Sequence, residues 1–374
     1  MLSPLPSPLL RISGDALRHN YRLLARRLSP ASLIPVLKAN AYGHGARLLL
    51  PLLLEEGASV FAVASGTEAL SLGAFFQKSE EECKSSFTYK PILLILGTVA
   101  EEELADLCAL RVVLSVHSPA YVAALEASLM HRRARGILPD GFRMPVAIKC
   151  ECGMNRLGFS RISDTLSLFS SEALTPVMLY SHLGETDSPR FREGRDRFSV
   201  FVSLLSHTGH PLFTHLAASP ALPYGGALGC EAARVGLAFY GLSEGIEGLR
   251  AVMRFCAAVL SVKRVRKGEG IGYGSYRAPR DMRVACLAAG YADGIPPSAR
   301  RARVRLSDRL VPIVGELCMD RLFLEIGEMP LQEGDEVTLF GADAADTRRF
   351  AAECAVTPYQ LLSVRSERSR RILS

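Results

Sequence analysis

Short, almost wholly apolar segments recur along the first two-thirds of this 374-residue chain. Each of them ends at a polar residue or a glycine, and such runs suit strands that are buried on both faces, as in a parallel sheet. Stretches with helical spacing of apolar residues separate them, at residues 67–72, 101–110, 120–130 and 190–205. The expected strands are residues 33–37, 60–64, 92–96, 112–116, 146–148, 177–180, 212–214 and 232–235.

Eight strand–helix repeats in about 240 residues predict an α/β protein with a (β/α)₈ barrel of the TIM type. A doubly wound open sheet is the alternative, and the number of strands favours the barrel. Beyond residue 248 the pattern changes, because apolar and polar residues alternate at 303–306 and 322–326. This alternation predicts a mainly antiparallel β domain. We therefore expect a barrel domain over residues 1–245 and a C-terminal β domain over residues 246–374.

Composition argues against several kinds of partner, namely nucleic acid, a membrane and a metal ion. The net charge of +6 comes with no Trp and no segment that pairs basic clusters with aromatics, which argues against a nucleic-acid partner. The apolar runs are shorter than the ~20 residues that a membrane span needs. The nine cysteines form no CxxC pair, so we expect neither a disulfide framework nor a metal site, and a cytoplasmic location.

In a barrel of this kind, the active site lies where the strands end. The residues at those positions include Lys38, Lys149, Arg156, His182, His215, Ser219, Arg234, Gly236 and Leu237. A lone lysine at a strand end is more often simply solvated, but desolvation and nearby cations turn an amine into a nucleophile. Ser219 and the amides after Gly236 would hold a phosphate ester. A lysine beside a phosphate site predicts pyridoxal phosphate as cofactor.

The sequence resembles the alanine racemases at several collinear motifs that span nearly the whole chain. Residues 36–45, VLKANAYGHG, resemble the family's pyridoxal-phosphate attachment signature, and residues 149–158, KCECGMNRLG, resemble its K-x-D-T-G-M-x-R-L-G segment. Further matches are the R-x-G-[IL]-x-x-Y-G segment at 234–241, the two tyrosine motifs at 272–274 and 290–294, and the C-M-D motif at 318–320.

The resemblance implies a role for each matching residue. Lys38 would hold the cofactor as an imine, Arg234 would face its pyridine nitrogen, and Arg156 would bind its phenolic oxygen and orient the substrate carboxylate. The cofactor phosphate would be bound by Tyr42, Ser219, Tyr359 and the amides of Gly236 and Leu237. The amide of Met319 would bind the substrate carboxylate, with Tyr291 and Asp320 as supporting residues. Lys149 matches a position that is often a carbamylated lysine in the family.

The resemblance also implies a two-base racemase that interconverts L- and D-alanine and supplies D-alanine for peptidoglycan. Lys38 would serve one face of the substrate carbon and Tyr273, reaching in from the second subunit of a homodimer, the other. His182 would be the hydrogen-bonded neighbour of that tyrosine. Tyr276 is a nearby alternative base, but the Gly-Tyr-Gly context selects Tyr273.

Three alternatives differ in what they need from the chain. A racemase of another small amino acid, such as serine, would use the same residues. A decarboxylase of the same fold would carry a carboxylate where Arg234 stands, because only a carboxylate keeps the ring nitrogen protonated. A non-enzymatic pyridoxal-phosphate homeostasis protein would resemble the barrel half alone, and the second domain argues against it.

Some positions depart from the family pattern. Glu151 and Cys152 replace the usual Asp and Thr, and Ala218 stands where family members commonly have Asn, which removes one hydrogen bond to the cofactor. We interpret Cys150 and Cys152 as small buried hydrophobes. His44, His215 and Tyr180 are expected to be structural or core residues.

Overall fold

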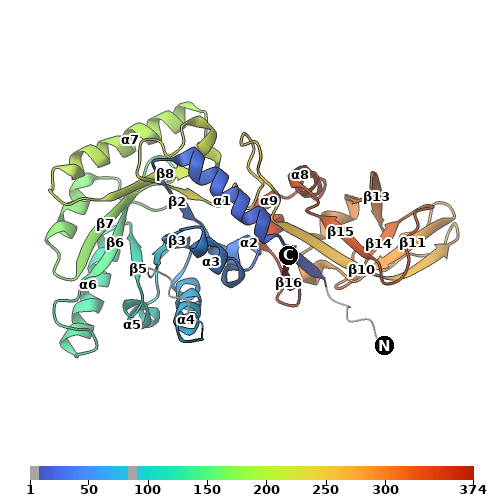
Figure 1. Cartoon of the computed structure of the whole chain (residues 1–374), viewed down its shortest axis with the longest axis horizontal. Coiled ribbons are helices and arrows are strands. Elements are labelled where there is room, and N and C mark those ends of the chain that lie inside the picture. Colours follow the sequence, from blue (N-terminus) through green and yellow to red (C-terminus); the bar gives the residue numbers. More distant parts are fainter. Residues whose placement is uncertain (1–7, 83–90) are drawn as a thin grey trace.

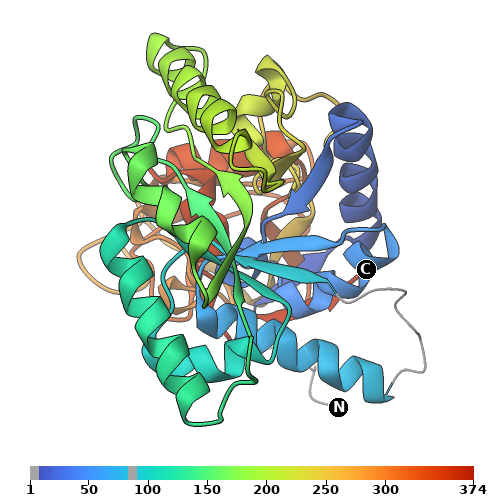
Figure 2. The same cartoon turned by 90° about the vertical axis from the view of Figure 1, so that its left-hand side faces the viewer.

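In the computed structural model, which describes residues 8–82 and 91–374, eight parallel strands form a nearly closed barrel. The strand order is β2-β9-β8-β7-β6-β5-β4-β3, and a bridge between Val36 and Ala62 connects the two end strands. Figure 2 looks toward this barrel, with helices around its strands. The predicted barrel is confirmed, and the open sheet is excluded. The barrel strands are β2 (Ser32–Pro35), β3 (Val60–Val63), β4 (Ile92–Ile95), β5 (Val112–Val116), β6 (Met144–Lys149), β7 (Leu174–Tyr180), β8 (Phe213–Ala218) and β9 (Ala232–Val235).

Helices and turns connect the barrel strands. The first long helix begins where the Ser13 side chain accepts a hydrogen bond from the Ala16 amide, at 3.2 Å, and its Leu17, Leu24 and Leu28 face the core. The α-helical elements are α1 (Gly14–Leu28), α2 (Lys38–Tyr42), α3 (Ala46–Glu55), α4 (Gly66–Glu82), α5 (Leu104–Cys108), α6 (Pro119–Ala134), α7 (Pro189–Ser206), α8 (Ala344–Glu353) and α9 (Pro358–Ser363). The 3₁₀ turns are η1 (Glu101–Glu103), η2 (Ile162–Ser170), η3 (Ser219–Tyr224), η4 (Tyr291–Asp293) and η5 (Pro297–Arg301).

The second sheet is mainly antiparallel and is built around one long strand, β10. This strand pairs with β11, β15 and β1, and β16 then pairs with β1 in parallel. Strand β1 is the first element of the described residues, and the sequence patterns did not predict it. Both the first and the last described strands therefore join the second sheet (Figure 1). Its strands are β1 (Leu9–Ile12), β10 (Met253–Val265), β11 (Met282–Leu287), β12 (Arg303–Leu306), β13 (Arg309–Val314), β14 (Leu322–Glu325), β15 (Glu336–Phe340) and β16 (Arg370–Leu373).

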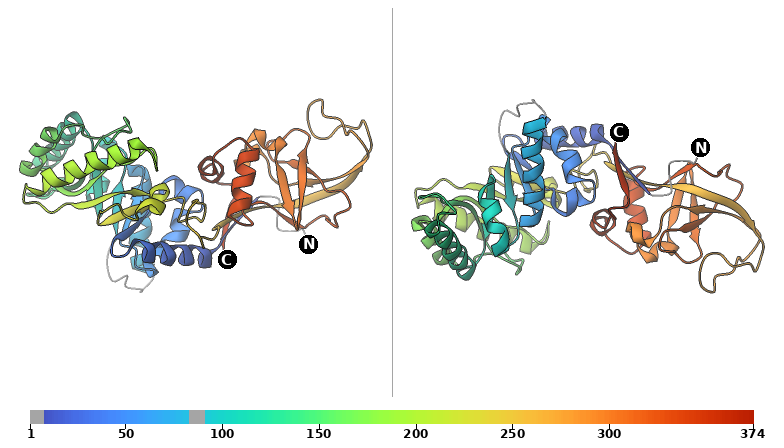
Figure 3. Two further views of the ribbon diagram at one scale, coloured as in Figure 1. Left: turned by 90° about the horizontal axis from the view of Figure 1, so that it is seen from above. Right: turned by 90° about the horizontal axis from the view of Figure 1, so that it is seen from below.

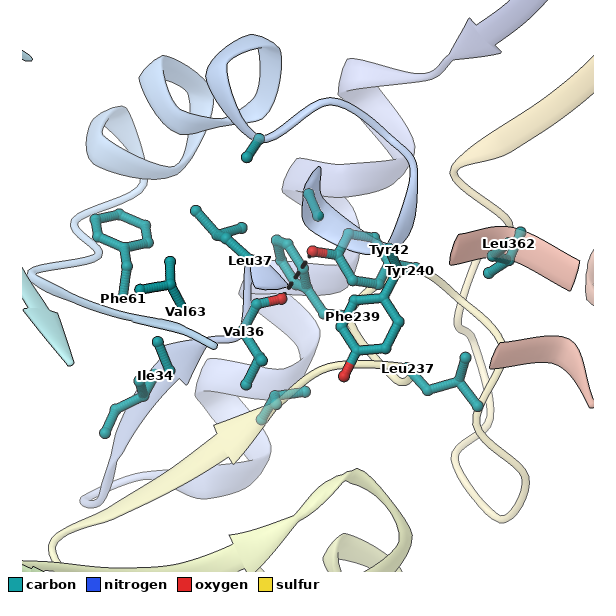
Figure 4. Packing of buried hydrophobic residues seen from close by; sticks show 14 of the residues in the cluster. Ile34, Val36, Leu37, Tyr42, Phe61, Val63, Leu237, Phe239, Tyr240 and Leu362 are labelled. Atoms are coloured by element: carbon teal, nitrogen blue, oxygen red, sulfur yellow. Dashed lines mark hydrogen bonds between the residues drawn. The ribbon is translucent and has the colours of Figure 1, made fainter. Parts of the chain in front are cut away.

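The two lobes lie along the long axis of the molecule, as the views from above and below show (Figure 3). One cluster of buried apolar residues runs from the barrel into the second lobe. Figure 4 shows the part of this core behind the end of β2, where the Tyr240 hydroxyl donates to the Val36 carbonyl oxygen at 2.9 Å. Across the described residues, no helix is both long enough and apolar enough to span a membrane.

Candidate active site

The ends of the barrel strands surround one cavity of about 540 Å³. It contains the predicted residues of the barrel and one from the second lobe: Lys38, Tyr42, Lys149, Arg156, His182, Ser219, Arg234, Gly236, Leu237 and Tyr359. A larger and more open hollow of about 1040 Å³ lies at the opposite end, where β2, β8 and β9 begin. None of the predicted site residues lines that hollow, so the predicted site lies in the cavity at the strand ends.

Lys38 leaves the barrel directly before an unusual turn. The next four residues, Ala39 to Tyr42, have φ angles of 51°, 52°, 57° and 51°, so the chain makes one left-handed turn without any glycine. This turn directs the Lys38 side chain into the cavity. Burial lowers the pKa of the Lys38 amine, and the positive charges of Arg156 and Arg234 lower it further, while Glu68 opposes them. The amine is therefore more easily deprotonated than a solvated lysine, as a nucleophile or base requires.

Next to the lysine, hydroxyl and amide groups form a cradle that suits an anion. The Ser219 Oγ is buried and accepts hydrogen bonds from the amides of Gly236 and Ala238, at 3.0 and 3.2 Å. A Cβ atom on Gly236 would lie 2.6 Å from the Tyr42 hydroxyl, so only glycine leaves this space open. The rings of Tyr42 and Tyr359 lie 6.0 Å apart. Burial raises the pKa of Tyr42, which keeps its hydroxyl protonated and able to donate.

Arg234 lies in β9 and is 4% exposed. Its guanidinium donates to the carbonyl oxygens of Ser181 and His215, at 2.6 and 2.9 Å, and to the Nδ1 atom of His215. The Nδ1 atom of His182 lies 3.5 Å from the same guanidinium. Burial lowers the pKa of Arg234 to about 10, so it remains a cation at neutral pH.

The two histidines beside Arg234 are neutral. Burial and then Arg234 lower the pKa of His182 to about 3, and the same causes lower the pKa of His215. Each imidazole can therefore present an unprotonated nitrogen to the guanidinium. Sequence reasoning treated His215 as a secondary core residue, whereas the structure makes it the main side-chain partner of Arg234. No local pattern distinguished these two roles.

Lys149 and Tyr180 line the same cavity. The Lys149 Nζ lies 5.8 Å from the centre of the Tyr180 ring, and the Arg234 guanidinium lies 5.0 Å from it. The Tyr180 hydroxyl is 2.7 Å from the Ser115 Oγ. Burial, Arg156 and Arg234 lower the pKa of Lys149 to about 8. Tyr180, expected as a core residue, thus also lines the cavity and faces two of its cations.

The loop that carries Arg156 is organised by Glu151, one of the departures from the family pattern. Its carboxylate accepts hydrogen bonds from the amides of Gly153, Asn155 and Arg156, at 2.7, 2.9 and 3.3 Å. Burial opposes ionisation, but these hydrogen bonds outweigh it and lower the pKa of Glu151. The neighbouring Cys150 and Cys152 are buried, in agreement with a packing role.

Apart from Tyr359, the predicted residues of the second lobe do not line the cavity of the same chain. Tyr273 is 73% exposed and stands between Gly272 and Gly274, which have φ angles of 67° and 78°. Met319 is 57% exposed. The amides of Tyr291 and Ala292 donate to the carbonyl oxygens of Cys318 and Met319, at 3.1 and 2.8 Å. Tyr291, Met319 and Asp320 therefore belong to two loops that are joined side by side, and we call these loops, together with the Tyr273 turn, the tyrosine face.

The barrel with its site at the strand ends, followed by a second β domain, defines the class of two-domain barrel enzymes. Family comparison agrees with this class: residues 12–244 match the model of the alanine racemase N-terminal domain and residues 252–373 that of its C-terminal domain. The chain belongs to the alanine racemase family, and it is an isomerase. Because the match includes both domains, the alternative of a non-enzymatic protein that resembles the barrel alone is not favoured.

Individual relatives match over nearly their whole length. The alanine racemase of Xanthomonas campestris is 34% identical over 363 residues, covering 94% of each chain. That of Corynebacterium glutamicum is 31% identical over 367 residues, covering 94% of this chain and 95% of the relative. Among solved structures, the biosynthetic alanine racemase of Pseudomonas aeruginosa has a TM-score of 0.81 at 27% identity, covering 99% of this chain and 100% of its own. The alanine racemase of Bartonella henselae, solved with covalently bound pyridoxal phosphate, has a TM-score of 0.81 at 24% identity and covers 98% of this chain and 99% of its own.

Proposed function

We propose that this protein is a pyridoxal-phosphate-dependent racemase that interconverts L- and D-alanine and supplies D-alanine for peptidoglycan. The observation that carries the proposal is the single cavity in which Lys38, with its lowered pKa, adjoins the cradle of Tyr42, Ser219 and Gly236. Family membership supports the activity, and the Bartonella structure supports the cofactor. A cytoplasmic location is part of the proposal, and the free thiols of the eight described cysteines are compatible with it.

The residues of the cavity fit this cofactor. The phosphate would be held by the hydroxyls of Tyr42, Ser219 and Tyr359 and by the amides of Gly236 and Leu237, in space that a side chain on residue 236 would fill. Lys38 would hold the aldehyde carbon. When bound, the cofactor supplies an electron sink that stabilises the charge left on the substrate carbon after proton removal.

Arg234 would face the ring nitrogen and set how strong that sink is. Its guanidinium is a cation that can donate a hydrogen bond to the ring nitrogen but can accept none from it, and its histidine partners are neutral. Arg234 would therefore favour the unprotonated ring nitrogen. A carboxylate at this place would do the opposite. A moderate sink suits a reaction in which one proton leaves and one returns without side reactions. Arg156, held by the Glu151 loop, would orient the substrate carboxylate together with the Met319 amide.

Racemisation needs a base on each face of the planar carbon. Lys38 would remove or return the proton on one face, and Tyr273 would do so on the other. The proton taken by one base is matched by a proton given by the other, so the configuration inverts, one base ends protonated and the other ends deprotonated. Because Tyr273 is exposed and lies outside its own cavity, we propose a head-to-tail homodimer in which each tyrosine face completes the partner's site.

The proposal is tested by a chiral assay of the products from L-alanine and from L-serine, with added pyridoxal phosphate. We expect D-alanine to form at the higher rate and Lys38→Ala to abolish it. Tyr273→Phe should slow proton removal from one enantiomer of α-deuterated alanine far more than from the other, because a phenyl ring cannot act as a base on its face.

Three outcomes would contradict the proposal or a part of it. A wild-type chain that binds the cofactor but forms no D-amino acid would exclude racemisation. Faster racemisation of serine than of alanine would move the substrate to the alternative amino acid while leaving the chemistry intact. Equal, mild effects of Tyr273→Phe on both enantiomers would exclude a one-sided base.

A further inference from the structure

The barrel has a weak seam beside Lys38. Among the described residues, strands β2 and β3 share the single bridge of Val36 and Ala62, with the Leu37 amide donating to the Ala62 carbonyl oxygen at 2.8 Å. The other neighbouring pairs of barrel strands are joined by at least two paired positions each. Pro35 at the end of β2 also has no N–H to donate. The main-chain hydrogen bonds between β2 and β3 therefore end directly before Lys38.

The carboxylate of Glu68, in the first turn of α4, spans this seam. Its Oε1 accepts a hydrogen bond from the Ala39 amide and its Oε2 accepts one from the Ala64 amide, both at 2.7 Å. Ala39 follows Lys38 directly, and Ala64 follows the last residue of β3. The Ser65 Oγ accepts from the Glu68 amide at 3.3 Å and so orients the start of the helix. One side chain thus joins the ends of two strands that the ladder leaves apart.

The same contact supports a strained turn. Ala39 is the first of the four left-handed residues after Lys38, a conformation that is unfavourable for L-residues. At the far end of the turn, the Asn40 Oδ1 accepts from the Ala46 amide at 2.7 Å, and Arg371 donates to the Gly43 carbonyl oxygen at 2.8 Å. Glu68 acts at the near end, on the peptide group that joins Lys38 to Ala39. It therefore restrains the backbone from which the lysine side chain extends.

We propose that Glu68 is a positioning residue for Lys38: its carboxylate closes the seam between β2 and β3 and fixes the direction in which the lysine enters the cavity. The inference rests on the proposed function only in treating Lys38 as the reactive amine. Glu68 also contributes a negative charge near the Lys38 amine. The cations near Lys38 are Arg156, Arg234 and Lys149, and His182 is neutral. The negative charge of Glu68 moderates the effect of these cations on the amine.

The test uses the full chain and the substitution Glu68→Gln. A glutamine has nearly the same shape but offers one acceptor oxygen and one NH₂ donor, so at least one of the two amides loses its acceptor. Hydrogen–deuterium exchange followed by mass spectrometry should show roughly tenfold or faster exchange at Ala39 or Ala64, in peptides spanning residues 37–45 and 61–66. Peptides elsewhere should exchange as in the wild type.

A second readout measures how the negative charge of Glu68 affects the titration of the Lys38 amine. Trace acylation of Lys38 with acetic anhydride across pH, on the full chain freed of cofactor, gives the titration midpoint of its amine. In Glu68→Gln this midpoint should move to lower pH, because a carboxylate no longer favours the ammonium form. In Glu68→Asp the charge remains but the side chain is shorter, so the midpoint should stay near wild type while local exchange rises.

Glu103→Gln is the matched control. Glu103 accepts from the Thr67 hydroxyl at 2.6 Å and from the Ala100 amide at 3.1 Å, close to the start of α4 but with no contact to the lysine turn. It should leave both readouts at Lys38 unchanged. Wild-type behaviour of Glu68→Gln in both readouts, or the same change in the control, would overturn the proposal. If hydrogen–deuterium exchange rises in every peptide of Glu68→Gln, Glu68→Asp gives the answer. Faster exchange of Glu68→Asp confined to the peptides 37–45 and 61–66 supports the proposal, and faster exchange everywhere contradicts it. Neither readout depends on turnover of alanine, so absence of racemase activity would count against the proposed function alone.

Discussion

At the residue scale, His44 shows how burial determines protonation near the lysine turn. Its ring stacks on Tyr240 with centroids 4.3 Å apart, and its Nδ1 lies 2.9 Å from the Ala41 carbonyl oxygen. The Nε2 atom is buried and has no hydrogen-bond partner. A proton there would be a cation without an acceptor, so burial lowers the pKa of His44 to about 4, against the opposing hydrogen bonds with Ala41 and Tyr42.

This leads to a prediction for stability against pH. Between about pH 6.5 and pH 4, the unfolded chain protonates this histidine and the folded chain does not, so the free energy of unfolding falls as the pH falls. In His44→Phe, that fall should be shallower by about 1.4 kcal/mol per pH unit in this window. Urea unfolding at several pH values measures the slope. If the free energy of unfolding fell equally with pH in the wild type and in His44→Phe, a lowered pKa of His44 would be contradicted.

At the scale of elements, an ion pair between a buried carboxylate, Asp293, and a half-exposed arginine, Arg368, attaches the tyrosine face to the C-terminal segment. The Asp293 carboxylate in η4 is 0% exposed and accepts from the Gly290 amide at 2.8 Å and from the Arg368 Nε at 2.7 Å. Arg365, beside it, lies 5.0 Å from the Phe255 ring centre and donates to the Gly294 carbonyl oxygen. The turn of Tyr291 is thus held against the segment that follows α9, the helix of Tyr359.

We expect Asp293→Asn to lower the free energy of unfolding by about 1–3 kcal/mol, because the NH₂ group of asparagine replaces one acceptor oxygen at this buried position. Glu193→Gln in α7 is the control: Glu193 pairs with Arg197 at 2.8 Å, but both side chains are more than half exposed, and the loss should be about 0.5 kcal/mol or less. Urea unfolding of both variants checks the contrast. Similar small losses would mean that the junction contributes no more than a surface pair.

At the scale of the whole molecule, the distribution of site residues predicts how two inactive chains combine. If Tyr273 serves the partner's cavity, a dimer of Lys38→Ala with Tyr273→Phe contains one site with both bases and one with neither. Refolding the two variants together in equal amounts should restore about a quarter of wild-type activity, since half the dimers are mixed and each has one complete site. Racemisation measured before and after mixing gives the answer. A mixture that stays as inactive as its components would exclude shared sites.

Local sequence determined much of this protein. Short apolar runs suit strands that are buried on both faces, and eight of them in alternation with helices predict a barrel, which the structure contains. Because parallel strands end at one edge, the strand pattern alone assigns residues as distant in sequence as Lys38 and Arg234 to one mouth of the barrel. The family resemblance then identified the tyrosine motifs, whose roles stay predictions.

Only the tertiary structure decided how these parts support one another. That residues 9–12 pair with β10, that His215 bonds Arg234 and that Glu68 joins Ala39 to Ala64 all depend on contacts between distant segments. A glutamate near a helix start has the same local pattern whether it is solvated or spans a barrel seam. Hydrophobic periodicity reports which face of an element is buried, whereas the partner of a polar group depends on where the folded chain brings its donors and acceptors.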